Sequence, residues 1–301
     1  MSVDELREKL SGVVAIPVTP FDEQGDLDEP AYTKVIRRMV DGGIEVLTPN
    51  GNTGEFYALT EPETRQAVDI TVGAAGDGVT VLAGVGRSVP DAVAAARHAE
   101  RAGAHAIMIH QPVHPYQSSA GWVDYHRAVA DAVPDLGVVL YVRNPRIGGE
   151  QIARLGELSP NVIGVKYAVP DPVRFAGVAR DAGADRFVWL AGLAELSAPG
   201  YWAVGATGFT SGLANVDPAL SLSLLTALRA GDRRAAMDVW ESIRPFEQLR
   251  AAGESENNVS VVKEALAQLG VCRPDVRPPC TPLSDGGKAA VSAMLRTWGL
   301  T

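Results

Sequence analysis

Only five lysines occur in this sequence of 301 residues, and one of them lies in a run of apolar residues. This is Lys166, in the segment Val162–Tyr167, which reads Val-Ile-Gly-Val-Lys-Tyr. Burial in such a run disfavours the ammonium form, lowers the pKa of the amine and leaves a nucleophile that can attack a ketone to form a Schiff base. The alternative is a structural lysine that pairs with a carboxylate or extends to solvent. Lys166 is therefore the first candidate for a catalytic residue.

A phenol and a glycine-rich segment follow two other apolar runs. Tyr141 ends the run 137–141. A phenol beside an amine can relay protons during imine formation and during cleavage of a C–C or C–O bond, although an aromatic ring packed at a rim is an equally ordinary role. The segment Gly51-Asn52-Thr53-Gly54-Glu55 offers backbone N–H groups suited to a carboxylate. A Gly-x-x-Gly segment alone is more often only a turn.

Short apolar runs that alternate with helical patterns must position these residues. Eight runs have the composition of strands: 13–18, 44–49, 79–85, 106–110, 137–141, 162–167, 187–191 and 206–210. The alternation predicts an α/β fold of the (β/α)8 TIM barrel type, with the active site at the carboxyl ends of the strands. A doubly wound open sheet is the alternative. It is disfavoured because Val18-Thr19-Pro20-Phe21, and no G-x-G-x-x-G turn, follows the first strand.

The helical patterns carry recognisable ends. Thr60 and Glu63 form a capping box, and Gly103 is placed to close the helix 89–102. After the eighth strand only helices are expected, at 233–249, 259–269 and 287–297. We therefore predict a barrel over residues 1–228 and a C-terminal helical extension over residues 229–301 that packs on the barrel.

Composition and charge exclude several classes of protein. The chain has 27 basic and 36 acidic residues, a formal charge of −9, and 46% hydrophobic residues, which is typical of a globular protein. No basic run of the kind that binds nucleic acid occurs, and glycines and prolines interrupt the uncharged run 196–216. Residues 1–5 are largely polar, so we expect no export leader. Neither Cys272 nor Cys280 has the spacing of a zinc site or a disulfide framework. We expect a cytoplasmic protein that binds neither nucleic acid nor membrane.

The order and spacing of several segments resemble the dihydrodipicolinate synthase/N-acetylneuraminate lyase family. The resemblance covers nearly the whole chain, and no single segment is decisive. The matching segments are Pro17-Val18-Thr19-Pro20-Phe21, Gly51-Asn52-Thr53-Gly54-Glu55, Tyr141, Gly164-Val165-Lys166, Ala214-Asn215, Arg277-Pro278-Pro279 and Thr281-Pro282-Leu283.

The resemblance implies a class I mechanism that needs no metal and no organic cofactor. Lys166 would form an iminium with a 2-oxo acid, and Tyr141 with the Thr53 hydroxyl would relay protons. Backbone N–H groups of Asn52 and Thr53, in the loop that Gly51 opens, would hold the carboxylate. Thr210, at the end of the eighth strand, joins the substrate-binding candidates. Members of the family are usually homotetramers, built as dimers of dimers.

The match to lysine-pathway members of the family is incomplete. Those members carry two adjacent threonines where this chain has Asn52 and Thr53, and His114 stands where their tyrosine reaches a neighbouring subunit. Tyr116 could replace that tyrosine only if the loop shifts. Arg146 lies where they bind an aldehyde substrate's carboxylate, which suits a guanidinium, and Arg143 competes for that role. Phe56-Tyr57 instead resembles members that dehydrate or cleave deoxy-keto sugar acids.

The leading hypothesis is a Schiff-base-forming lyase, an aldolase or dehydratase, that acts on pyruvate or a deoxy-keto sugar acid. The alternative within the same chemistry is the condensation that forms dihydrodipicolinate in lysine biosynthesis. A non-catalytic ligand-binding barrel is less favoured, because Thr53, Tyr141 and Lys166 are all present. A phosphate-binding barrel synthase would need an anion site after the last strands, where only Ser211-Gly212 is available. The sequence does not identify the 2-oxo acid.

Overall fold

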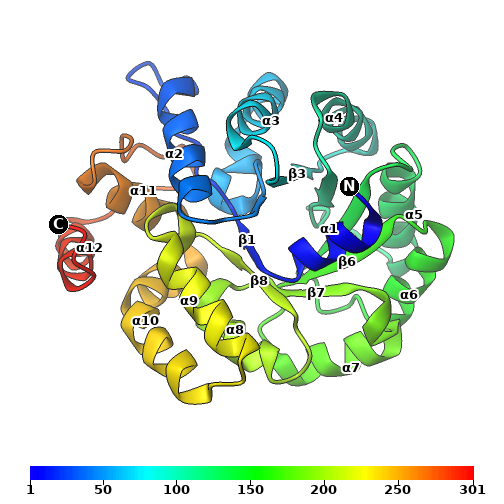
Figure 1. The fold of residues 1–301 in the computed structure, drawn as a ribbon. Helices are drawn as coiled ribbons and strands as arrows, with labels where there is room; N and C mark the ends of the chain where they lie inside the picture. The colour runs from blue at the N-terminus through cyan, green and yellow to red at the C-terminus, as the bar shows by residue number, and fades with distance from the viewer. The chain divides into compact units, whose positions relative to one another are not determined.

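The computed structural model describes residues 1–301 and contains a closed barrel whose eight strands follow one another in chain order (Figure 1). The strands are β1 (Val13–Ala15), β2 (Val46–Leu47), β3 (Thr80–Val85), β4 (Ala106–Ile109), β5 (Gly137–Val142), β6 (Val162–Tyr167), β7 (Val188–Ala191) and β8 (Gly208–Ser211). Pairing from β2 to β8 is parallel throughout. The predicted (β/α)8 barrel is confirmed, and the doubly wound open sheet is excluded.

Two strands are shorter than the sequence predicts by three residues or more. The predicted run 13–18 ends as a strand at Ala15, because Pro17 has no N–H to donate and the Val18 N–H donates to the Asn215 side-chain oxygen at 3.0 Å. The predicted run 44–49 is reduced to Val46–Leu47. Beyond it the chain turns at Asn50, whose φ of 61° is incompatible with an extended strand.

The chain divides into two compact units. Unit 1 comprises residues 1–14, 45–48 and 80–210, and unit 2 comprises residues 15–44, 49–79 and 211–301. The helices of unit 1 are α1 (Val3–Leu10), α4 (Val89–Ala102), α5 (Ser119–Ala130), α6 (Gly149–Leu158), α7 (Pro172–Ala182), the short η3 (Ala184–Arg186) and α8 (Ala194–Trp202). Those of unit 2 are α2 (Glu29–Asp41), η1 (Asn52–Gly54), η2 (Phe56–Ala58), α3 (Glu61–Ala75), η4 (Leu213–Asn215), α9 (Pro218–Arg229), α10 (Arg233–Ser255), α11 (Asn258–Gln268) and α12 (Asp285–Thr297). The predicted boundary between residues 228 and 229 falls at the end of α9 and stays a prediction.

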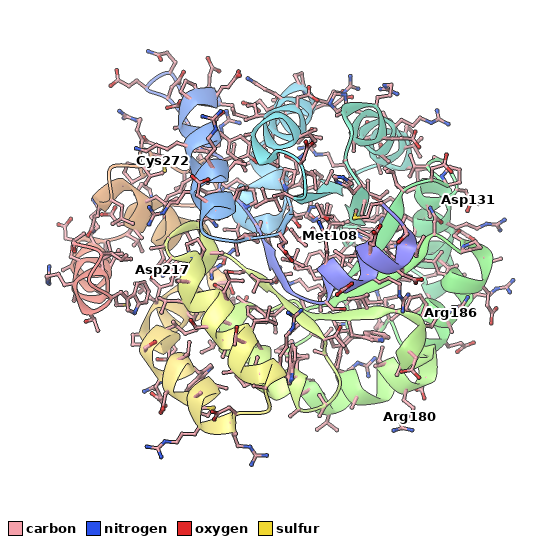
Figure 2. The ribbon with its side chains drawn as sticks, viewed as in Figure 1. Met108, Asp131, Arg180, Arg186, Asp217 and Cys272 are labelled. Atoms are coloured by element: carbon pink, nitrogen blue, oxygen red, sulfur yellow. The ribbon has the colours of Figure 1, made fainter.

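Unit 1 is held by a core of apolar side chains from the strands and from α1. Leu6 and Leu10 of α1 pack with residues of β1 to β7, among them Met108 and Tyr141. Full burial of a leucine contributes roughly 1.5–3 kcal/mol to folding. In Figure 2, Met108 lies among the strands of unit 1, whereas Arg180 is exposed at its margin. The core therefore fixes the strands that carry the predicted catalytic residues.

The predicted helix ends are found where the sequence places them. The Thr60 hydroxyl accepts from the Glu63 N–H, and the Glu63 carboxylate accepts from the Thr60 N–H, so the capping box is confirmed. Gly103 closes α4 with a φ of 94°, which glycine adopts without strain. In α10 the helix is broken at residues 252–254, close to the predicted end at 249. None of the helices has the length and apolar character needed to cross a membrane.

Helix α11 is unusual because eight consecutive residues, Val259 to Leu266, are buried. Most helices bury one face only. Two of the eight residues, Lys263 and Glu264, carry charge, and a buried charge needs a partner. The residues of unit 2 around α11 must therefore supply partners for these two charged side chains.

Candidate active site

Lys166 lies in the middle of the barrel sheet of unit 1, with 2% of its surface exposed. It pairs with Tyr141 on β5 and with Leu190 on β7 in the strand register. Its Nζ lies 4.5 Å from the centroid of the Tyr141 ring. Burial, together with the smaller effect of the positive charge of Arg143, lowers the pKa of Lys166 to about 7. A large fraction of the amine is therefore uncharged near neutral pH, as a nucleophile requires.

A glycine that sequence reasoning did not single out makes room for this lysine. Gly192 directly follows β7, and a Cβ at that position would lie 3.0 Å from Lys166 Cγ and 2.8 Å from the Tyr167 carbonyl oxygen. The distance to the Tyr167 oxygen is too short for a real side chain, and the distance to Lys166 Cγ is tighter than most real contacts. Gly192 therefore allows the lysine side chain to pass the end of β7. Its only signal in the sequence was a glycine immediately after an apolar strand.

Tyr141 also contacts a buried histidine. His110, which follows β4, packs edge-to-face on Tyr141 with ring centroids 5.9 Å apart. His110 is 1% exposed and Tyr141 is 5% exposed. The two rings and the Lys166 amine thus form one continuous cluster across β4, β5 and β6.

The other candidates of unit 1 differ in exposure. Thr210 on β8 is buried, whereas Arg143, Arg146 and His114 are exposed. The Arg146 N–H donates to the Asn144 side-chain oxygen at 3.0 Å, and the Tyr116 N–H donates to Nδ1 of His114 at 3.1 Å. Of these groups, Arg143 is the one whose charge acts on Lys166. The guanidinium of Arg146 is available at the protein surface.

The glycine-rich loop lies in unit 2 and is packed tightly against the chain that follows β1. A Cβ on Gly51 would lie 2.5 Å from Cγ2 of Ile16, and one on Gly54 would lie 2.9 Å from the Pro17 carbonyl oxygen. The Thr19 hydroxyl also donates to the Gly54 carbonyl at 2.8 Å. The two glycines of the motif are therefore required by close approach, which explains their spacing.

The loop is a single turn of 3₁₀ helix. The N–H groups of Gly54 and Glu55 donate to the carbonyls of Gly51 and Asn52 within the turn. The amide of Thr53 takes no part in these bonds, and the Thr53 side chain is 3% exposed. The structure thus brings Lys166 and Tyr141 together in unit 1, and holds Gly51, Asn52 and Thr53 together in unit 2.

Two motifs that carried the family resemblance have structural roles in unit 2. The Asn215 amide donates to the carbonyls of Ile16 and Gly212, at 2.8 and 2.9 Å, and so ties the segment after β1 to η4. The Arg277 guanidinium pairs with the Glu63 carboxylate and holds the pKa of that group well below its usual range.

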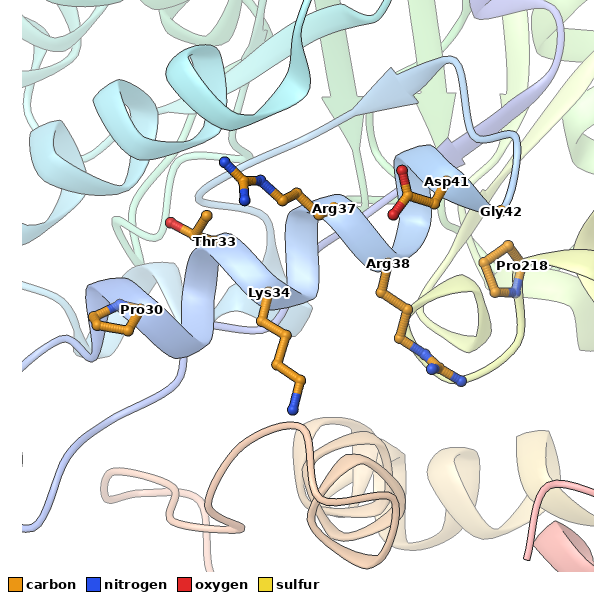
Figure 3. A pocket seen from close by; sticks show the side chains of 8 residues that line it. All are labelled: Pro30, Thr33, Lys34, Arg37, Arg38, Asp41, Gly42 and Pro218. Atoms are coloured by element: carbon orange, nitrogen blue, oxygen red, sulfur yellow. The ribbon is translucent and has the colours of Figure 1, made fainter.

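One cavity of about 630 Å³ lies beside α2 in unit 2 (Figure 3). Its lining includes three basic side chains, but none of the predicted site residues. Lys34 donates to the Gly270 carbonyl, and Arg38 donates to the carbonyls of Asn215 and Val216, so two of the three cations brace the fold. The residues that line this cavity are Pro30, Thr33, Lys34, Arg37, Arg38, Asp41, Gly42 and Pro218.

The chain has no cluster of three or more His, Cys, Asp or Glu side chains that could hold a metal ion.

A (β/α)8 barrel with a buried lysine and a tyrosine on adjacent strands is the arrangement expected of a class I lyase. The sequence matches the model of the Dihydrodipicolinate synthetase family over residues 9–298. The chain therefore belongs to this family.

Individual relatives agree with this assignment. The chain is 36% identical to a 4-hydroxy-tetrahydrodipicolinate synthase of Methylobacterium radiotolerans, over 97% of each protein. It is 34% identical to a probable 5-dehydro-4-deoxyglucarate dehydratase of Rhodococcus opacus, over 94% of this chain and 93% of that protein. The crystal structure of dihydrodipicolinate synthase from Oceanobacillus iheyensis superimposes with a TM-score of 0.93 at 37% identity, over 99% of each chain.

The predicted family and the predicted enzyme class, a carbon–carbon or carbon–oxygen lyase, are therefore confirmed. Both named activities fall within the predicted class of Schiff-base lyases. The sequence predicted this outcome from short segments, and the fold and relatives now support it along nearly the whole chain.

Proposed function

We propose that the protein forms a Schiff base between Lys166 and a 2-oxo acid and uses it to break or form a C–C or C–O bond. The observation that carries this proposal is the state of Lys166. It is buried in the barrel sheet, its pKa is lowered to about 7, and its Nζ lies 4.5 Å from the ring centroid of Tyr141. A lysine with these properties is suited to attack a carbonyl carbon.

The reaction begins when the Nζ lone pair adds to the ketone carbon of the 2-oxo acid. The resulting carbinolamine loses water to give an iminium. In C–C cleavage the iminium accepts the electron pair of the bond that breaks. In loss of water it accepts the electron pair of an adjacent C–H bond, and the enamine so formed expels hydroxide, which takes up a proton and leaves as water. Protonation of the enamine and addition of water then release the product and restore the free amine. The iminium itself is the electron sink, so the proposal calls on no cofactor and no metal.

Proton transfer and carboxylate binding are assigned to the remaining candidates. We assign the proton relay to Tyr141 and the Thr53 hydroxyl, and the carboxylate to the backbone amides of Asn52 and Thr53 in the loop opened by Gly51. Two features support the second assignment. The turn leaves the Thr53 amide out of its own hydrogen bonds, and Gly51 packs directly on Ile16.

The substrate we favour is a deoxy-keto sugar acid or pyruvate in an aldolase or dehydratase reaction. Asn52 in place of a second threonine and Phe56-Tyr57 after the loop support it, as does the relative in Rhodococcus opacus that is named a dehydratase. The lysine-pathway condensation of pyruvate with aspartate semialdehyde is the second candidate. Arg146, with its exposed guanidinium, and the relative in Methylobacterium radiotolerans favour it.

Trapping with borohydride tests the chemistry. The protein is incubated with pyruvate or with 5-dehydro-4-deoxyglucarate and reduced, and a stable adduct of the matching mass is expected on Lys166 alone. Lys166→Ala is expected to form no adduct and to have no turnover. An unmodified Lys166, under conditions that trap a control class I aldolase, would refute the proposal.

A substrate panel with one variant separates the two candidates. Turnover of 2-oxo sugar acids is compared with turnover of pyruvate plus aspartate semialdehyde, in the wild type and in Arg146→Ala. A loss of at least tenfold confined to the semialdehyde reaction would establish the lysine-pathway activity. For a sugar-acid lyase we expect turnover of the sugar acid and none of the semialdehyde.

Several further assignments rest on the family resemblance. We propose a cytoplasmic homotetramer, built as a dimer of dimers, in which residues 1–228 form the catalytic barrel and residues 229–301 an accessory helical extension. His114 and Thr210 are assigned to substrate binding. Size-exclusion chromatography with light scattering tests the assembly, because the scattering mass of a tetramer must be four times the chain mass of 31.7 kDa.

A further inference from the structure

The glycine-rich loop ends at a residue with an uncommon backbone conformation. Glu55 has a φ of 58°, in the left-handed region, and is 5% exposed. A side chain with a Cβ is strained there, whereas glycine adopts the conformation freely. The backbone therefore does not explain a glutamate at this position. The contacts of its side chain do.

Both oxygens of the Glu55 carboxylate are occupied by groups from the C-terminal part of unit 2. Lys263 Nζ, from α11, donates to Oε1, and the Arg277 N–H donates to Oε2 at 2.8 Å. The side chains of Lys263 and Glu55 are 0% and 1% exposed, so the ion pair is fully buried. Lys263 also donates to the Asp275 carbonyl at 2.7 Å and lies 4.0 Å from the centroid of the Phe21 ring.

A buried pair of this kind constrains position strongly. Separating the two charges inside the protein would leave each without its partner in a low-dielectric surrounding, which costs far more than breaking a surface pair. The ion pair therefore holds the Glu55 carboxylate beside the Lys263 ammonium group. Because Glu55 follows Gly54 directly, the end of the glycine-rich loop is fixed to α11.

A second contact from α11 reaches the loop at Thr53. Nδ2 of Asn258 donates to the Thr53 hydroxyl oxygen in a long hydrogen bond of 3.5 Å. The Asn258 side chain is held in turn by Arg250, whose Nη2 donates to its Oδ1 at 2.7 Å and whose Nη1 pairs with Glu247 at 2.5 Å. Because the Thr53 oxygen accepts from Asn258, the Thr53 hydroxyl proton points away from Asn258.

We propose that Lys263 and Asn258 are positioning residues, through which α11 holds the glycine-rich loop and its Thr53 hydroxyl in the conformation that receives the 2-oxo acid. The inference rests on the proposed function. It also explains why α11 is buried on all sides. The helix carries Lys263 to the buried Glu55 carboxylate, and this ion pair is shielded from water only if the protein surrounds the helix.

Replacing Lys263 by methionine tests the ion pair. The variant keeps the length of the side chain and removes the charge. We expect the KM for the 2-oxo acid to rise at least tenfold, and the amides of residues 51–57 to exchange hydrogen at least tenfold faster, with Lys166 still trapped by borohydride at saturating 2-oxo acid. Val291→Ala on α12, at a fully buried position of unit 2, is the control for general destabilisation. It should leave both quantities within about twofold of the wild type.

The double variant Glu55→Gln/Lys263→Met guards against a failure to fold, because a neutral pair is tolerated where one unpaired charge is not. We expect its melting temperature to recover while its KM and loop exchange stay raised. The inference would be overturned if the melting temperature, the KM and the loop hydrogen exchange of the double variant all returned to wild-type values. It would also be overturned if Lys263→Met folded and its loop amides exchanged at the wild-type rate. A wild type that forms no borohydride adduct would instead refute the proposed function, and the exchange result would still stand by itself.

Asn258 is tested by its coupling to Thr53. Asn258→Ala should lower kcat several-fold in the wild type and have no further effect in Thr53→Val, because the hydroxyl through which it acts is then gone. Equal losses in both backgrounds would show that Asn258 does not act through Thr53.

Discussion

Replacing Lys166 by methionine should stabilise the protein at neutral pH, by an amount that shrinks as the pH rises. In the folded protein burial lowers the pKa of Lys166 to about 7, against 10.5 for an unperturbed lysine. Between these two values the unfolded chain binds more protons than the folded one. The free energy of unfolding of the wild type must therefore rise with pH across this window. A methionine does not titrate, so the variant lacks this dependence.

The magnitude follows from the size of the shift. A fall from 10.5 to about 7 corresponds to roughly 5 kcal/mol at about 1.36 kcal/mol per pH unit. Linkage places nearly all of this penalty at or below about pH 7, and about 3 kcal/mol of it disappears between about pH 7 and about pH 9.5. The stability difference between Lys166→Met and the wild type should shrink by that amount over the same interval.

Urea unfolding at matched protein concentration measures this difference at several pH values. Arg234→Met, at an exposed arginine, serves as the control for the loss of one positive charge. A difference between Lys166→Met and the wild type that stays constant within about 0.5 kcal/mol from about pH 7 to about pH 9.5 would refute the reasoning. It would mean that Lys166 remains a charged ammonium in the folded protein, and the proposed nucleophile would be lost with it.

Three other variants test separate parts of the structure. Tyr141→Phe should lower turnover by roughly 10²–10⁴-fold while borohydride still traps an adduct on Lys166, as mass spectrometry and steady-state kinetics can show. Burial lowers the pKa of His126 to about 4, so the wild type should lose about 3 kcal/mol of stability between about pH 7 and about pH 4, and a His126→Leu variant that shows the same loss by urea unfolding would contradict this. Gly212→Ala would drive a methyl group into the Arg250 guanidinium, which should cost about 1–3 kcal/mol and lower the melting temperature; an unchanged melting temperature would show that Arg250 is free to move.

Local patterns in the sequence were sufficient for the barrel and for Lys166. Strands and helix ends depend on residues close in the chain, so the apolar runs and the capping box of Thr60 and Glu63 predicted elements that the structure contains. Lys166 was identifiable because it interrupts an apolar strand. The errors were in strand length. The largest were at β1, which ends before Pro17, a residue with no N–H to donate, and at β2, which covers only Val46–Leu47 of the predicted run 44–49.

Contacts between distant segments were beyond sequence reasoning. Gly192 matters because a side chain there would collide with the Tyr167 carbonyl and crowd Lys166, and no local pattern predicts which strand end approaches which side chain. Lys263 and Glu55 are 208 residues apart. The helix around Lys263 was predicted correctly, but a lysine in a helical pattern ordinarily faces solvent. Only the folded chain shows that this one is enclosed with a carboxylate.

The two buried lysines of this protein show why burial alone does not identify a catalytic amine. Burial lowers the pKa of both, but the Glu55 carboxylate opposes the effect at Lys263 and holds it as a charged partner. At Lys166 the nearby charge is the guanidinium of Arg143, which acts in the same direction as burial. Desolvation therefore acts on a lysine that is paired with a carboxylate in unit 2, and on a lysine that has a second cation near it in unit 1. The neighbouring charge, rather than the depth of the lysine, decides between anchoring a loop and attacking a carbonyl.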